Sequence, residues 1–176
     1  MSPFNMIPYL EFDGVRSFAD SFIALLYERC EFEGHSETVF YEGTIRNETE
    51  FVKALKSSVT WLVVQDEVIV AVIWLTRHEG KFARFHFITF QACARRHLVK
   101  MGQYVLREIM QMKDNSGKFT FDMLLGSIPA RNRGAVNYAK KCGGKVCGEL
   151  PNGAWIEREG KSENAILIAV TREILS

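Results

Sequence analysis

Ser127-Ile-Pro-Ala-Arg-Asn132-Arg-Gly-Ala135-Val-Asn-Tyr138-Ala139-Lys-Lys141-Cys-Gly143-Gly144 is the stretch of sequence that decides the fold. An apolar run over Phe119 to Ile128 leads into it and predicts a buried strand. Asn132 is suited to cap a helix over 131–142, and Gly143 is suited to end it, because glycine readily adopts the left-handed conformation. A capped helix that directly follows a buried strand lies at the carboxyl edge of the sheet, where open sheets bind ligands.

The segments before residue 95 predict two helices and then three strands. Apolar residues at helical spacing predict a first helix from Ser17 to about Cys30, with a face of Phe18, Phe22, Leu25, Leu26 and Arg29. Asn47 and Glu50 have the spacing of a capping box ahead of a short helix over 51–56. Runs rich in Val, Ile, Trp and Phe at 60–64, 68–76 and 82–90 predict an antiparallel meander.

The pattern returns to helix at Arg95. Leu98, Met101, Val105, Ile109 and Met112 recur at helical spacing, and Asn115-Ser116-Gly117 is expected to close this long helix. After the quoted stretch, two strands are predicted at 145–150 and 164–171. The economical packing of this order is a mixed sheet with a parallel pair in its middle.

Length and composition fit one globular domain. The chain has 176 residues, of which 47% are hydrophobic and 24% charged, and these values are typical of a soluble folded protein. No apolar run is long enough to span a membrane and the start has no secretory pattern, so a cytoplasmic location is expected. The four cysteines show neither a CxxC pair nor a metal-finger spacing, which predicts reduced thiols and no metal site.

Charge is distributed unevenly along the chain. Residues 1–50 carry three basic and ten acidic side chains, whereas residues 51–176 carry nineteen basic and eleven acidic ones. This asymmetry fits an anionic ligand bound by the later part and a cationic substrate met by the earlier part. A solvated surface without a specific ligand explains it equally well.

The order of elements and the quoted stretch resemble the GCN5-related N-acetyltransferase (GNAT) family over nearly the whole chain. The family's strand is followed by N-x-x-A-x-x-aromatic and K-x-G, and Asn132, Ala135, Lys141 and Gly143 stand at these positions. The resemblance implies one domain over 1–176 with a GNAT-like acyl-CoA N-acyltransferase fold. This is an α/β class with a mixed, mostly antiparallel sheet of about six to seven strands, a parallel pair splayed at its middle, and about four flanking helices. It also implies acetyl-coenzyme A as cosubstrate.

The resemblance places the coenzyme pyrophosphate at the start of the long helix. The family holds it there with a basic, glycine-rich loop, whereas this chain has His97 at the usual Arg or Gln position and Lys100 at one of the glycine positions. Cations at a helix start could replace the backbone contacts by pairing with phosphate, or they could simply be solvated or face acidic residues. The predicted cofactor-binding residues are Phe87, Ile88 and Thr89, whose main-chain N–H groups polarise the thioester, together with Arg95, Arg96, His97, Lys100, Gly102 and Asn132.

Catalytic side chains are less clearly marked. The family's general acid is a tyrosine one position after the aromatic residue, and this chain has Ala139 there. Tyr138 is one residue early, about 100° around the helix, which favours a structural role. Cys142 or water could donate the proton in its place. His86, within an aromatic strand, is the candidate general base, and a core histidine is the alternative.

The acceptor implied by the resemblance is an amine of a small molecule or a peptide. The first helix and the connection after it are expected to contact it, where Glu31, Glu33, Glu37 and Glu42 could attract a cation or merely keep the segment soluble.

Two other classes of function compete with the transferase. Lys100, Ala139 and Gly144, the last in place of a usual aromatic, resemble divergent acetyltransferase-like phage virion components, which suggests a fold relative that has lost catalysis. A homodimer or a phage protein is then a candidate partner. Nucleic-acid binding through Arg95, Arg96, Arg131 and Arg133 is less favoured, because aromatics are not interleaved with these cations.

Overall fold

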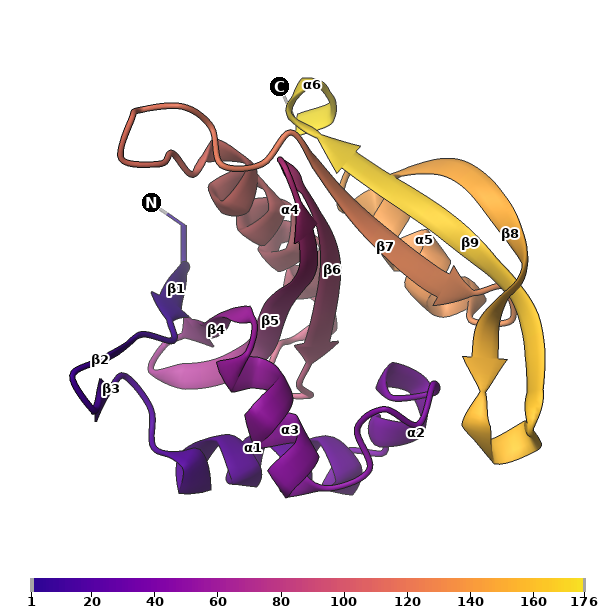
Figure 1. Ribbon diagram of the computed structural model, residues 1–176, viewed down its shortest axis with the longest axis horizontal. Coiled ribbons are helices and arrows are strands. Elements are labelled where there is room, and N and C mark those ends of the chain that lie inside the picture. The colour runs from indigo at the N-terminus through magenta and orange to yellow at the C-terminus, as the bar shows by residue number, and fades with distance from the viewer. Residues whose placement is uncertain (1, 176) are drawn as a thin grey trace. The chain divides into compact units, whose positions relative to one another are not determined.

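The computed structural model describes residues 2–175, and its elements are drawn in Figure 1. The helices are α1 (Asp20–Phe32), α2 (Ser36–Val39), α3 (Glu48–Lys56), α4 (Arg95–Gln111), α5 (Arg133–Lys141), α6 (Arg172–Leu175) and the 3₁₀ helix η1 (Glu157–Glu159). The strands are β1 (Phe4–Pro8), β2 (Glu11–Phe12), β3 (Val15–Arg16), β4 (Val59–Gln65), β5 (Val68–Glu79), β6 (Phe82–Thr89), β7 (Met123–Pro129), β8 (Lys145–Ile156) and β9 (Lys161–Thr171).

The main sheet has seven strands in the order β1-β4-β5-β6-β7-β9-β8, and β2 and β3 form a separate hairpin. β1 pairs with β4, β4 with β5, and β7 with β9, all antiparallel. β6 and β7 are parallel, with Phe82 opposite Met123 and Arg84 opposite Leu125. Parallel neighbours need a crossover connection, and α4 lies in it. The predicted mixed sheet with a parallel pair is therefore confirmed.

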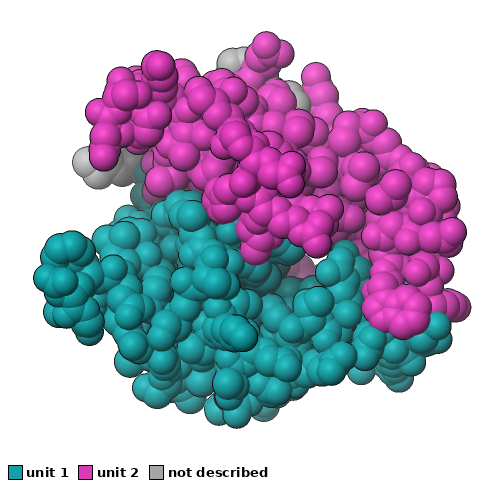
Figure 2. Space-filling view, viewed as in Figure 1, with its two compact units in different colours: residues 1–75, 86–93, 156–160 teal, residues 76–85, 94–155, 161–176 magenta. Residues whose placement is uncertain are grey.

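The chain divides into two compact units, coloured separately in Figure 2. Unit 1 comprises residues 1–75, 86–93 and 156–160, and unit 2 comprises residues 76–85, 94–155 and 161–176. β5 and β6 each contribute residues to both units. The expectation of a single domain stays a prediction.

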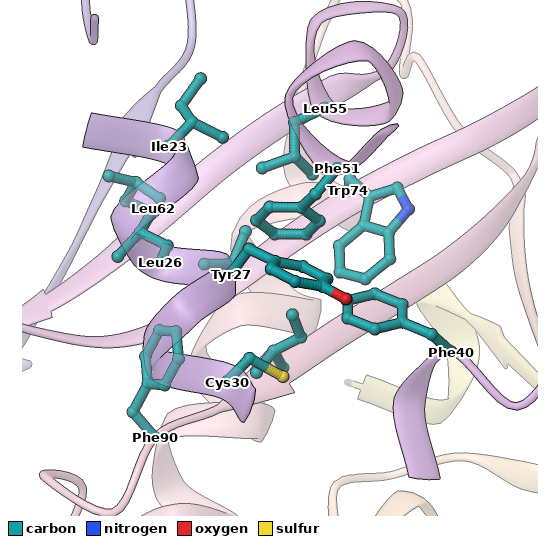
Figure 3. Close-up of a cluster of buried hydrophobic side chains, with 12 residues drawn as sticks. Ile23, Leu26, Tyr27, Cys30, Phe40, Phe51, Leu55, Leu62, Trp74 and Phe90 are labelled. Atoms are coloured by element: carbon teal, nitrogen blue, oxygen red, sulfur yellow. The ribbon is translucent and has the colours of Figure 1, made fainter. Parts of the chain in front are cut away.

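Unit 1 is built around a cluster of buried side chains, shown in Figure 3 and here called the aromatic cluster. Its members are Ile23, Leu26, Tyr27, Cys30, Phe40, Phe51, Leu55, Leu62, Val72, Trp74, Ile88 and Phe90. Phe51 from α3 packs edge-on against Trp74 from β5, with ring centroids 6.2 Å apart, and Tyr27 from α1 stacks on Phe40 at 5.7 Å. Phe51 is fully buried, and Tyr27, Phe40 and Trp74 are at most 9% exposed. Rings of this size contribute large apolar areas, so the cluster fixes both helices on their side of the strands.

Two predictions about the start of the chain are wrong. α1 begins at Asp20, not at Ser17, because the N–H of Ser17 donates to the carbonyl of Leu10 and closes the β2–β3 hairpin. The buried face therefore consists of Ile23, Leu26, Tyr27 and Cys30, while Leu25 is 58% exposed. The sequence also failed to indicate β1, since its Pro8 is a residue that strands tolerate only at an edge.

The predicted cap of α3 is confirmed, with one change. The Asn47 side chain accepts from the N–H of Glu50 at 2.9 Å, as a capping box requires. The Glu50 carboxylate reaches back to the N–H of Arg46 at 2.7 Å, one residue earlier than in the usual box. α3 consequently begins at Glu48, three residues before the predicted start.

Unit 2 differs from the predictions at the ends of its elements. α4 stops at Gln111, because Met112 is extended and 37% exposed, and Asp114 forms a turn by accepting from the N–H groups of Ser116 and Lys118. β7 begins at Met123 and not at Phe119, which forms only an isolated bridge. β8 and β9 are longer than predicted and are joined by η1 and Gly160, whose φ is +59°.

The structure also describes the state of the cysteines and the character of the helices. All four cysteines are free thiols, with Cys30, Cys93 and Cys142 buried and Cys147 exposed. Among residues 2–175, no helix combines the length and the apolar character that crossing a membrane requires.

Candidate functional site

The start of α4 is the most basic helix end in unit 2. Ala94 provides no side-chain cap, and Arg95, Arg96 and Lys100 are exposed. Within residues 2–175 none of these three cations forms an ion pair. Cations are unfavourable at the N-terminus of a helix, because this end of the helix dipole is positive. An anion bound there would interact favourably with the dipole and the cations, and it would accept hydrogen bonds from the first N–H groups of α4.

His97 lies in the same turn. Its side chain is half-buried, and its main-chain N–H donates to the carbonyl of Ala94 at 2.7 Å, which tightens the first turn of α4. The imidazole is thus placed beside the basic residues at the helix start by the local backbone.

α5 runs from Arg133 to Lys141, shorter than the predicted helix over 131–142, because Asn132 and Cys142 are its cap residues. The Asn132 side chain accepts from the N–H of Ala135 at 3.1 Å. Gly143, with a φ of +109°, follows the C-cap residue Cys142 and ends the helix. Both roles inferred for these residues from capping chemistry are confirmed.

Tyr138 and Cys142 join α5 to α4. The Tyr138 hydroxyl donates to the carbonyl of Leu98 at 3.0 Å, and the Cys142 thiol donates to the carbonyl of Val99 at 3.9 Å. Burial raises the pKa of the Cys142 thiol to about 11, and a hydrogen bond with Tyr138 opposes this only in part. Both candidate proton donors are therefore engaged in the contact between the two helices.

Gly102 allows this contact. A Cβ atom on Gly102 would lie 2.4 Å from the sulfur of Cys142 and 2.7 Å from the hydroxyl oxygen of Tyr138. Close packing of α5 is thus sufficient to explain a glycine in the third turn of α4.

We expect Gly102→Ala to destabilise the protein by about 1–3 kcal/mol, since added atoms in a packed contact cost more than the gain of about 1 kcal/mol in helix propensity. Urea unfolding measures the difference. The matched control is Gly134→Ala in α5, where the nearest atom to an added Cβ is 3.8 Å away, and we expect it to be neutral or stabilising. Equal stability of the two variants would contradict this account of the α4–α5 contact.

Gly144 has a similar explanation. A Cβ atom there would lie 2.4 Å from Cγ2 of Ile168 in β9 and 3.0 Å from the carbonyl oxygen of Ala139. The aromatic residue that the GNAT pattern has at this position has no room in this chain. This departure from the pattern follows from how closely α5 packs on β9.

The second half of β6 places the other candidates in unit 1. His86 is half-buried and stacks on Trp74, with centroids 5.2 Å apart and ring planes 10° apart. Ile88 is 1% exposed and belongs to the aromatic cluster, whereas Phe87 and Thr89 are half-buried. Because successive side chains of a strand point to opposite faces, Phe87 and Thr89 lie on the face opposite to His86.

Sequence reasoning missed Trp74 as the neighbour of His86. The stacking joins adjacent strands, and the pairing register of a meander cannot be read from its residues alone. The period-2 pattern of β5 was the available signal, since it predicts on which face Trp74 lies but not which residue of β6 it meets.

The acidic residues proposed to attract an acceptor are partly neutralised. Glu37 pairs with Arg158 at 2.6 Å, and the carboxylate of Glu33, 8% exposed, is bound by Arg29 at 2.9 Å and by the N–H of Gln91 at 2.6 Å. Glu31 and Glu42 are exposed. Glu33 and Glu37 are thus each paired with an arginine and contribute little net charge to the surface of unit 1.

Comparison with known proteins identifies the fold. No protein-family model and no curated protein sequence matches the chain. Among solved structures, it is similar to spermidine N-acetyltransferase from Vibrio cholerae in complex with CoA and spermine, with a TM-score of 0.72, 9% identity and 98% of each chain covered.

Two further structures agree. Ribosomal-protein-S5-alanine acetyltransferase from Vibrio fischeri has a TM-score of 0.66 at 12% identity, covering 100% of this chain and 97% of its own. A GNAT-family acetyltransferase from Streptococcus pneumoniae has a TM-score of 0.63 at 15% identity, covering 96% and 98%. The chain therefore has the fold of the GNAT acetyltransferases over its whole described length.

Proposed function

We propose that this protein is an acetyl-coenzyme A-dependent N-acetyltransferase that acts on an amine of a small molecule or a peptide. The observation that carries the proposal is the basic start of α4, where Arg95, Arg96 and Lys100 form no ion pair within residues 2–175 and which lies in the crossover of a GNAT fold. Charge and geometry there suit a diphosphate, and acetyl-coenzyme A would supply the acetyl group as a thioester.

The donor set at the start of α4 fits such a ligand. Arg95, Arg96 and Lys100 would pair with phosphate oxygens, and His97 and the first N–H groups of α4 would add hydrogen bonds. The main chain of Phe87, Ile88 and Thr89 is our candidate for polarising the carbonyl group that is attacked. Asn132 serves as the cap of α5, so it would affect coenzyme binding only by fixing the position of that helix.

Proton transfer is assigned to His86 and to water. A ring nitrogen of His86 would take the proton from the incoming ammonium, so that the neutral amine attacks the acyl carbon, the C–N bond forms and the C–S bond breaks. As the C–N bond forms, the nitrogen loses its second proton, which water would relay to the departing thiolate, since the Tyr138 hydroxyl donates to the carbonyl of Leu98 and the Cys142 thiol donates to the carbonyl of Val99.

We expect Tyr138→Phe to leave kcat within roughly threefold of the wild-type value while lowering the free energy of unfolding by about 1 kcal/mol, because one hydrogen bond between α4 and α5 is lost. Initial rates and urea unfolding of the same preparation measure both. A fall in kcat of about a hundredfold would instead identify Tyr138 as the general acid.

Calorimetric titration with acetyl-coenzyme A, followed by an assay for release of the free thiol, tests the proposed function. Acceptors should include a polyamine such as spermine and peptides with a free α-amino group, because the similar structures include acetyltransferases for spermidine and for ribosomal proteins. Micromolar binding together with thiol release supports the transferase. Binding without turnover on any acceptor favours a fold relative that has lost catalysis, and absence of binding at millimolar concentration refutes the coenzyme site.

The place of action proposed here is the cytoplasm. The four free cysteines, three of them buried, fit a reducing compartment. Burial raises the pKa of the Cys30 thiol to about 12, so this residue stays protonated and unreactive at neutral pH.

A further inference from the structure

β8 forms an unprotected edge of the main sheet. It is the last strand in the sheet order, and among residues 2–175 no strand pairs with its outer side. β1, at the other edge, is only five residues long and ends at Pro8, whereas β8 has twelve residues. A long edge strand presents unpaired N–H and C=O groups that another chain can bind, and natural proteins usually shorten or cover such edges.

The first half of β8 also exposes apolar side chains. Val146 is 50% exposed and Leu150 is 48% exposed. Pro151 follows directly, and since proline lacks an N–H donor it ends the segment that could pair with another strand. The available segment is therefore Lys145 to Leu150, at the orange outer strand in Figure 1.

Charges on this segment are complementary to a second copy of the segment. Lys145, Cys147 and Glu149 alternate along the strand and lie on one face, and all three are exposed. Antiparallel pairing of two copies centred on Cys147 puts Lys145 of each copy opposite Glu149 of the other, twice in the symmetric pair. Pairing centred on Lys145 or Glu149 would instead put like charges opposite each other, which is unfavourable.

The two charged groups are free to make this contact. Lys145 has no ion pair within residues 2–175, and Glu149 uses only Oε1, which accepts from Nδ2 of Asn164 at 2.6 Å. Oε2 can accept from a lysine of a second copy without disturbing the bond that holds Glu149 to β9.

We propose that this protein forms a symmetric homodimer in which the Lys145–Glu149 segments of two β8 strands pair antiparallel about a twofold axis at Cys147. The contact is isologous, so that one surface serves both copies and the assembly closes at two. It removes the unpaired edge, covers Val146, and extends the sheet across the two chains. It does not depend on the proposed acetyltransferase activity.

Charge reversal tests this register. We expect Lys145→Glu and Glu149→Lys each to weaken dimerisation by at least about tenfold, since each puts two pairs of like charges opposite one another. An equimolar mixture of the two single variants should form a heterodimer, because every facing pair is again opposite in sign. Sedimentation equilibrium over a concentration series measures each association constant, with Lys140→Glu in α5 as the control of equal charge change.

Cross-linking gives a second, independent readout. Under diamide, two Cys147 thiols give up two protons and two electrons to the oxidant and should join two chains by one disulfide, because residues directly opposite in an antiparallel pair have Cβ atoms close enough for this bond. The other cysteines are buried, and Cys147→Ser should abolish the cross-link while leaving sedimentation unchanged.

Three outcomes overturn the proposal. The first is a chain that remains monomeric throughout the concentration series, and the second is a dimer that Lys145→Glu and Glu149→Lys leave intact. The third is a mixture of these two variants that associates no better than either alone. Urea unfolding of each variant shows that the monomer is folded, so a loss of dimer is not confused with loss of the fold.

Discussion

His86→Gln is expected to lower kcat for acetyl transfer by about 10²–10⁴-fold with little change in coenzyme affinity, which is the usual effect of removing a general base. Glutamine keeps much of the size and polarity of the imidazole beside Trp74, but it cannot take a proton. The measurement is the rate of thiol release as a function of pH. The acidic limb of the wild-type profile, where His86 becomes protonated and loses its function as a base, should be absent from the variant.

The control for this experiment is His78→Gln. His78 is exposed near the end of β5 and lies beside Phe121, and it has no role in the proposed chemistry. Its substitution should leave kcat and the pH profile unchanged. A His86→Gln enzyme that retains full activity and the same acidic limb would show that His86 is only a packing residue of the aromatic cluster.

Arg96→Ala combined with Lys100→Ala is expected to weaken the binding of acetyl-coenzyme A by about a hundredfold. Each substitution removes a cation from the start of α4, and hydrogen bonds to charged groups contribute roughly 1.5–3 kcal/mol apiece before solvent screening reduces them. Calorimetric titration measures the dissociation constant. Added salt should weaken binding to the wild-type protein more than to the double variant, since fewer ion pairs remain to be screened.

Arg107→Ala is the matched control for the cations. Arg107 is exposed on the same helix, away from its first turn. Its loss should leave coenzyme affinity unchanged. Stability gives a further contrast, because removing cations that oppose the dipole at the start of α4 should leave the melting temperature unchanged or raise it. Unaltered affinity in the double variant would reject the start of α4 as the anion site.

The elements that the sequence predicted best are those with strong local signals. Asn47 and Asn132 were identified as caps from residue type and spacing, and the structure confirms both. The meander and the parallel pair followed from the change of hydrophobic period and from the need for a crossover helix. These features depend on neighbours within a few residues, or on topological rules that hold for most sheets.

The errors lie where distant contacts override local pattern. Leu25 belonged to the predicted buried face of α1, but it is exposed in the structure. The β2–β3 hairpin precedes the helix, which begins at Asp20, and tertiary contacts bury Ile23 and Tyr27 instead. Phe119 was predicted to lie in a strand, yet it is held between Lys113 and Arg172, whose cations lie 5.3 and 4.4 Å from its ring centroid. Arg172 lies far along the chain from Phe119, so this contact is not visible in the surrounding sequence.

For the candidate site, the sequence by itself determined which residue types are present: the cations at the start of α4, the Asn132 cap and the single imidazole of β6. The tertiary structure decided what several of them touch. The approach of α5 to Gly102, the bond from Tyr138 to Leu98, and the stacking of His86 on Trp74 all join segments that are distant along the chain or in neighbouring strands. Caps and turns are determined by hydrogen bonds between residues close in sequence. The contacts between α4 and α5 and between β5 and β6 form only when these elements pack together, because close packing determines which side chains touch.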